Sequence, residues 1–188
     1  MKYVKSIATI TIMLMIATCV SAQNLSYNNI STGYINGDAS GLDYDGFGVE
    51  FIGEMNQNFF LLLGYTSLEF DNLSADGKAI GIGAGWHTPL NETIDFVATL
   101  AYSKNETNHI DGTGYSCAAG IRSMISDYIE LSAFLKYASI DFDDIGDTDG
   151  SGASISARYF IIETISTGVT VATFDSSDST TIDLRFDF

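Results

Sequence analysis

The chain has 188 residues, enough for one domain, with 24 acidic residues against eight basic ones and a formal net charge of −16. So large an acidic excess argues against nucleic acid as a partner, because surfaces that bind nucleic acid are basic. Beyond the N-terminal apolar run, no stretch is long and apolar enough for a transmembrane helix.

The first 22 residues have the pattern of an export signal. Lys2 and Lys5 precede a nearly apolar run at 7–20, and Val20-Ser21-Ala22 offers small residues for cleavage. A membrane anchor would need roughly 20 apolar residues, and this run is shorter. We therefore expect cleavage after about Ala22 and a single domain over 23–188. Since Cys117 is then the one remaining cysteine, that domain is expected to lack an internal disulfide.

After the signal, the chain repeats short segments in which apolar residues alternate with small or polar ones. A period of two is the signature of β-strands. We predict ten strands, at 27–36, 45–55, 59–70, 78–88, 94–104, 113–124, 128–139, 152–162, 165–174 and 179–188. An eight-stranded count is the alternative, and it would require two hairpins to merge.

The breaks between these segments differ in length. Breaks of about four residues fall at 55–58, 89–93, 125–127 and around 163, and the breaks that alternate with them are longer and rich in Gly, Asn and Ser. Many carboxylates gather in the longer breaks: Asp38, Asp43, Asp45, Asp71, Asp76, Asp141, Asp143, Asp144, Asp147 and Asp149. We therefore expect short turns on one side of the fold and long acidic loops on the other.

Three glycines in segment 78–88 invite comparison with a nucleotide-binding loop. Gly81, Gly83 and Gly85 fall at every second position of a predicted strand, whereas a nucleotide-binding loop requires a strand, a tight turn and then a helix. The spacing instead indicates an inward face so crowded that it needs small side chains.

The last predicted strand separates two all-β architectures. A sandwich turns its apolar face inward, whereas a membrane barrel turns it towards lipid. The terminal apolar set would be an aggregation hazard on a free edge, but a barrel pairs that strand with the first one. The members of this set are Ile182, Leu184, Phe186 and Phe188.

Three features carry a family resemblance: the alternating strands, the Gly-Ile-Arg-Ser-Met-Ile stretch at 120–125 and the aromatic terminus. In these features the chain resembles small bacterial outer-membrane β-barrel proteins, a group that includes porin-family proteins. The resemblance implies an all-β, antiparallel, up-and-down transmembrane barrel in the outer membrane of a Gram-negative bacterium. It also implies that Ile182, Leu184, Phe186 and Phe188 form the C-terminal signal that the barrel-assembly machinery recognises. The expected surroundings are outer-membrane lipid and lipopolysaccharide, and the expected state is a monomer without a cofactor.

The face opposite the apolar one carries most of the basic residues and would line the lumen. A lone charge in a narrow lumen loses its hydration, so charges of opposite sign are expected to pair and plug the barrel. This favours a structural or surface-interaction role, with a narrow porin for small solutes as the alternative. The predicted lumen charges are Glu50, Glu54, His87, Arg122, Glu130, Lys136, Arg158, Asp183 and Arg185.

Catalysis and metal binding have weaker support in the sequence. A barrel hydrolase needs an Asp/His or Ser/His constellation, and the chain has two histidines: His87, assigned to the lumen, and His109, close to Asp111 in a predicted loop. We therefore predict no enzyme activity. Asp143, Asp147 and Asp149 form a weak calcium candidate because their loop lacks the EF-hand order, and no metal is assigned.

Overall fold

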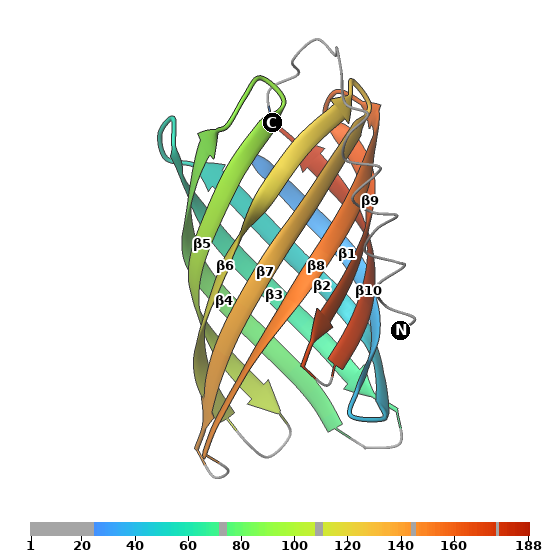
Figure 1. Cartoon of the computed structure of the whole chain (residues 1–188). Coiled ribbons are helices and arrows are strands. Elements are labelled where there is room, and N and C mark those ends of the chain that lie inside the picture. Colours follow the sequence, from blue (N-terminus) through green and yellow to red (C-terminus); the bar gives the residue numbers. More distant parts are fainter. Residues whose placement is uncertain (1–24, 72–74, 108–110, 144–145, 176) are drawn as a thin grey trace, which may run out of the picture.

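The chain folds into one closed β-barrel (Figure 1). The computed structural model describes residues 25–71, 75–107, 111–143, 146–175 and 177–188, so the predicted signal at 1–22 and His109 lie outside it. No helix in these ranges is long and apolar enough to cross a membrane. The ten strands are β1 Asn29–Ala39, β2 Leu42–Glu54, β3 Phe59–Phe70, β4 Ala75–Pro89, β5 Ile94–Thr107, β6 Asp111–Ser126, β7 Ile129–Phe142, β8 Gly146–Ile162, β9 Ile165–Phe174 and β10 Ser177–Asp187.

Each strand pairs antiparallel with its neighbours in sequence, and β1 closes the barrel on β10. The closing ladder runs from Asn29 opposite Asp187 to Ala39 opposite Ser177. Closure leaves no free strand edge, so the apolar terminal strand does not present the aggregation hazard of an unpaired edge. The prediction of a ten-stranded up-and-down barrel is confirmed, and the eight-stranded alternative is wrong.

The two ends of the barrel differ in what they carry. The terminal rim, at the top of Figure 1, holds the start of β1, the end of β10 and four of the turns, which lie at 55–58, 90–93, 127–128 and 163–164. The opposite ends of the strands lie at the far rim. The short turns predicted from the sequence are all on the terminal rim.

The prediction of long acidic loops is wrong, because the strands continue through most of them. Asp38, Asp43 and Asp45 lie within β1 and β2, which are joined by Ser40 and Gly41 alone. Both turn residues have positive φ, 55° and 84°, the geometry of a two-residue hairpin turn. Strand pairing satisfies backbone hydrogen bonds whatever the side chain, so outward aspartates do not end a strand that projects into water.

The outer face of the barrel is apolar. Leu135, Ile80 and Leu100 are 72%, 62% and 62% exposed, and the alternating set of β10 is exposed as well. Eight aromatic side chains also face outward: Tyr34, Phe47, Tyr65, Trp86, Tyr102, Tyr137, Tyr159 and Phe188. So much exposed apolar surface is a liability in water and the normal condition of a barrel wall in lipid. Recognition of the β10 set by the assembly machinery stays a prediction.

The inner face contains a small apolar cluster near the terminal rim. Tyr27, Phe60 and Val97 form its buried centre, and Ile52 and Leu62 are among the side chains that pack against it. The inward glycines of β4 make room here. A Cβ on Gly83 would approach the carbonyl oxygen of Leu100 to 2.6 Å, and one on Gly85 would overlap the ring of Phe60. The predicted crowding of this face is confirmed.

Replacing Gly85 by Ala should therefore destabilise the barrel. We expect a loss of about 1–3 kcal/mol of unfolding free energy, the usual range for an overpacked core, in urea titrations of the refolded protein. The matched control is Gly64→Ala, since Gly64 is also in a strand interior but no atom lies within 4 Å of its added Cβ. Equal effects of the two substitutions would contradict this assignment.

Candidate functional site

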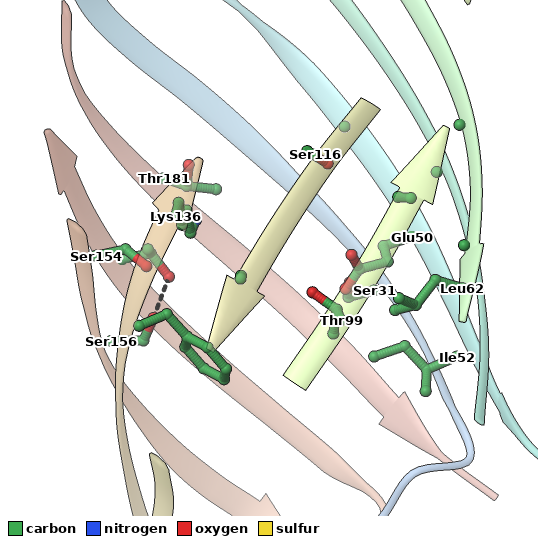
Figure 2. A pocket seen from close by; sticks show the side chains of 18 of the residues that line it. Ser31, Glu50, Ile52, Leu62, Thr99, Ser116, Lys136, Ser154, Ser156 and Thr181 are labelled. Carbon is green, nitrogen blue, oxygen red and sulfur yellow. Dashed lines mark hydrogen bonds between the residues drawn. The ribbon is translucent and has the colours of Figure 1, made fainter. Parts of the chain in front are cut away.

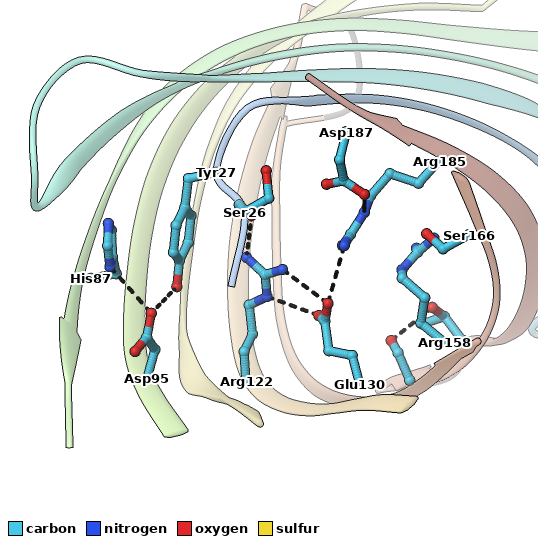
Figure 3. A network of polar contacts seen from close by, with 12 residues as sticks. Ser26, Tyr27, His87, Asp95, Arg122, Glu130, Arg158, Ser166, Arg185 and Asp187 are labelled. Carbon is cyan, nitrogen blue, oxygen red and sulfur yellow. Dashed lines mark hydrogen bonds and ion pairs between the residues drawn. The ribbon is translucent and has the colours of Figure 1, made fainter. Parts of the chain in front are cut away.

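The segment before β1 lies at the terminal end of the lumen. The backbone oxygen of Ser26 accepts a hydrogen bond of 3.1 Å from Nη1 of Arg122. At the rim, the side chain of Asn28 accepts from the backbone amide of Glu54 at 2.8 Å and donates to its carboxylate at 3.3 Å. These contacts hold Tyr27 in place between them, and its side chain is buried (Figure 3).

Tyr27 is at the centre of one polar and aromatic cluster. Its ring stacks on His87 with centroids 3.7 Å apart, and its hydroxyl donates to Asp95 at 2.9 Å. Nδ1 of His87 lies 3.3 Å from the same Asp95 carboxylate, within ion-pair distance but without hydrogen-bond geometry. The guanidinium carbon of Arg122 is 4.7 Å from the Tyr27 ring centroid, a cation–π distance. Burial raises the pKa of the Tyr27 hydroxyl, so it remains a donor at neutral pH.

Glu130 is at the centre of a second cluster. Its two oxygens receive Nε and Nη2 of Arg122 at 2.9 and 3.1 Å, a bidentate pair. Nη2 of Arg185 reaches the same carboxylate at 3.2 Å, and Nε of Arg185 reaches Asp187 at 3.1 Å. All four side chains are at least nine-tenths buried. Two arginines thus face two carboxylates, and we call these four residues the Glu130 network.

A separate ion pair lies beside this network. Nη2 of Arg158 on β8 is 2.6 Å from Asp183 on β10, and Nη1 donates to the hydroxyl of Ser166 at 3.2 Å. The pair joins two strands that are not neighbours, since β9 lies between them. Together with the Glu130 network, it places charge pairs across the terminal end of the lumen (Figure 3).

The predicted lumen residues divide into three groups. The structure joins five of them in ion pairs: Arg122, Glu130, Arg158, Asp183 and Arg185. His87 stacks on Tyr27, and Glu54 lies exposed at the rim, where it holds Asn28 rather than a lumen cation. Glu50 and Lys136 line the wall farther along the barrel.

Three contributors were missing from the sequence prediction: Tyr27, Asp95 and Asp187. The alternation that assigned His87 and Arg185 to the inner face also places Asp95 and Asp187 there, so the pattern could have revealed both. Tyr27 was assigned to the first strand, but it precedes β1. No sequence signal shows that this segment lies in the lumen.

A cavity of about 660 Å³ occupies the lumen beside these clusters (Figure 2). Small and hydroxyl side chains make up much of its wall, and Glu50 and Lys136 project into it. The hydroxyl groups come from Ser31, Thr66, Thr99, Ser116, Ser132, Ser154, Ser156, Thr170 and Thr181. This arrangement can hold water or a small polar molecule.

The acidic residues of the far rim do not assemble into a metal site in the part of the chain that the structure describes. No group of three or more His, Cys, Asp or Glu side chains there is placed to hold a metal ion. The weak calcium candidate of Asp143, Asp147 and Asp149 flanks residues 144–145, which lie outside the described ranges.

Comparison with known proteins reveals the fold and little more. No family model matches the sequence, and no curated protein is similar to it in sequence. Among solved structures, the β domain of the Bordetella autotransporter BrkA aligns over 87% of this chain and 100% of its own, with a TM-score of 0.57 at 10% identity. KdgM porin aligns over 84% and 99%, with a TM-score of 0.50 at 11% identity.

A bacterial polysaccharide outer membrane secretin aligns over 88% of this chain and 67% of its own, with a TM-score of 0.50 at 9% identity. At such low identity, these similarities show a shared architecture. The fold is that of bacterial outer-membrane β-barrels, as the resemblance in sequence implied.

Removing the carboxylate of Glu130 should strongly destabilise the barrel. Glu130→Ala leaves Arg122 and Arg185 buried without their shared partner, and breaking a buried pair in this way costs about 3–5 kcal/mol of unfolding free energy. Urea unfolding followed by circular dichroism would measure the loss.

The control for this substitution is Glu106→Gln. Glu106 pairs with Lys104 at 2.6 Å, but both side chains are about half exposed, so the unfolding midpoint should hardly move. If Glu130→Ala shifted the midpoint no more than Glu106→Gln does, the Glu130 network would not be structurally important.

Proposed function

We propose that the chain is a small outer-membrane β-barrel of a Gram-negative bacterium, with a lumen closed at the terminal rim and a structural or surface-interaction role. Its export signal would be cleaved after about Ala22. The terminal rim would face the periplasm and the far rim the outside. The protein would act as a monomer, without a cofactor and without enzyme activity.

The apolar outer face supports the membrane location. Aliphatic and aromatic side chains cover the wall, and the closed ladder leaves no unpaired strand edge in lipid. The strands have 10–17 residues, whereas about 10 tilted residues span a bilayer, so the longer ones would project beyond it.

The single observation that supports the proposal of a closed lumen is the packing around Tyr27 and Glu130. Tyr27, stacked on His87 and held by Asp95 and Arg122, lies beside a buried network that links β6, β7 and β10. A ten-stranded barrel is only slightly wider than an eight-stranded one, in which side chains fill the interior. These groups therefore suffice to obstruct one end of the passage.

The far rim supports a role at the cell surface. Its strand ends carry outward carboxylates, and the chain as a whole is strongly acidic. Such a surface repels anionic partners and gathers cations. We propose that divalent cations held there connect the protein to the phosphates of neighbouring lipopolysaccharide.

A narrow porin is the second candidate, and the cavity favours it. About 660 Å³ of lumen space with a hydroxyl-rich wall would suit the passage of small solutes if the terminal rim opened. One of the structures that shares the fold is described as a porin. The two candidates differ in the state of the terminal rim.

Planar-bilayer recordings distinguish the two candidates. The purified parent should give no steady conductance, because Tyr27 and the Glu130 network obstruct the lumen. The triple variant Tyr27→Ala/Arg122→Ala/Glu130→Ala should give stepwise currents, since it removes the ring and one charge of each sign.

Lys104→Gln, on the exposed outer wall, is the control and should behave like the parent. Large, steady conductance from the parent protein would defeat the closed lumen and favour the porin.

A further inference from the structure

Two charged lumen residues, Glu50 and Lys136, take no part in the clusters at the terminal rim. Within the described ranges, neither side chain forms a salt bridge within 4.0 Å, and neither has a hydrogen-bond partner there. Both are exposed to the cavity although the barrel wall surrounds them. The other charges that line this cavity are paired, so these two differ from their neighbours.

The barrel topology places these two charges on opposite walls. Glu50 lies on β2 and Lys136 on β7, and four strands separate β2 from β7 in either direction around the barrel. Figure 2 shows both side chains at the same cavity. The cavity therefore has a negative pole and a positive pole that face each other.

The remaining wall is divided in character. Ile52, Leu62 and Val97 give an apolar patch on the side of β2, β3 and β5. Hydroxyl groups dominate the side of β8 to β10, where Ser156 and Thr170 share a hydrogen bond of 2.7 Å. Small-molecule sites have about 300–1,000 Å³, mostly apolar walls and a few polar groups that fix orientation. A volume of about 660 Å³ lies within that range.

From this arrangement we propose that the cavity binds a small zwitterionic molecule with an apolar side group, of the free amino acid or short peptide class. Its ammonium group lies at Glu50, its carboxylate at Lys136 and its apolar part against Ile52 and Leu62. Two opposite charges in an enclosed lumen lose hydration, and a zwitterion gives each of them a counter-charge. The proposal rests on the closed terminal rim, because closure makes the lumen a pocket instead of a passage.

Calorimetric titration of the purified, folded chain with L-leucyl-L-leucine tests the proposal. We expect saturable binding, weakened about tenfold or more by N-acetylation of the dipeptide and likewise by amidation of its carboxylate, since each removes one charge contact. Glu50→Gln and Lys136→Gln should weaken binding of the unmodified dipeptide by a similar factor.

The charge-swapped variant Glu50→Lys/Lys136→Glu keeps both charges and exchanges the poles. It should bind the dipeptide again, in the reverse orientation. Binding by this double variant would show that the single variants lost affinity because a charge was removed and not because they misfolded. Lys78→Gln serves as the control, because Lys78 is absent from the cavity wall and should leave affinity unchanged.

No binding by the parent up to about 10 mM dipeptide, equivalent to less than about 3 kcal/mol of binding free energy, would overturn the proposal. Equal binding of the blocked dipeptides would overturn it as well, because the charged ends of the ligand would then make no contribution at Glu50 and Lys136. A closed barrel that binds nothing refutes this inference alone, whereas steady conductance of the parent refutes the closed lumen.

Discussion

The hydrogen-bonded ladder between β1 and β10 is the constraint on which the rest of the structure depends. Lipid offers no partner to a backbone amide or carbonyl, so a strand sheet can enter it only when every edge is paired. Closure then divides each strand into two faces with a period of two. Leu135 and Ile182 are exposed on the outer face, whereas Glu130 and Arg185 are buried within the lumen.

The same closure also constrains the charged residues of the lumen. The inner face is enclosed, so charged groups there need partners close by. Near the terminal rim, Arg122 and Arg185 share Glu130, and Tyr27 fills the space beside them. Farther along, the wall consists of small and hydroxyl side chains, and a cavity remains. The two proposals concern these two parts of one lumen: the obstruction at the rim and the binding pocket beyond it.

Much of the fold could be predicted because it depends on local alternation. The pattern of Ile80, Ile82 and Trp86 against glycines identified a strand, and ten such patterns identified the barrel. The far rim was mispredicted because Asp38 and Asp43 favour loops locally, whereas pairing with neighbouring strands extends β1 and β2 through them. Alternation also identified Arg122 and Glu130 as inward residues. It could not reveal that Arg185 shares Glu130, or that Tyr27 enters the lumen, since both depend on contacts between distant parts of the chain.

The apolar face of the barrel is expected to contact lipid, and Trp86 allows a direct measurement. It is the only tryptophan of the chain, it is 37% exposed on the outer face of β4, and its ring lies 6.1 Å from that of Phe96. Its fluorescence in vesicles should be quenched by phospholipids with brominated acyl chains and should respond little to aqueous iodide. Strong quenching by iodide, with none by brominated lipid, would show that this face of the barrel lies in water.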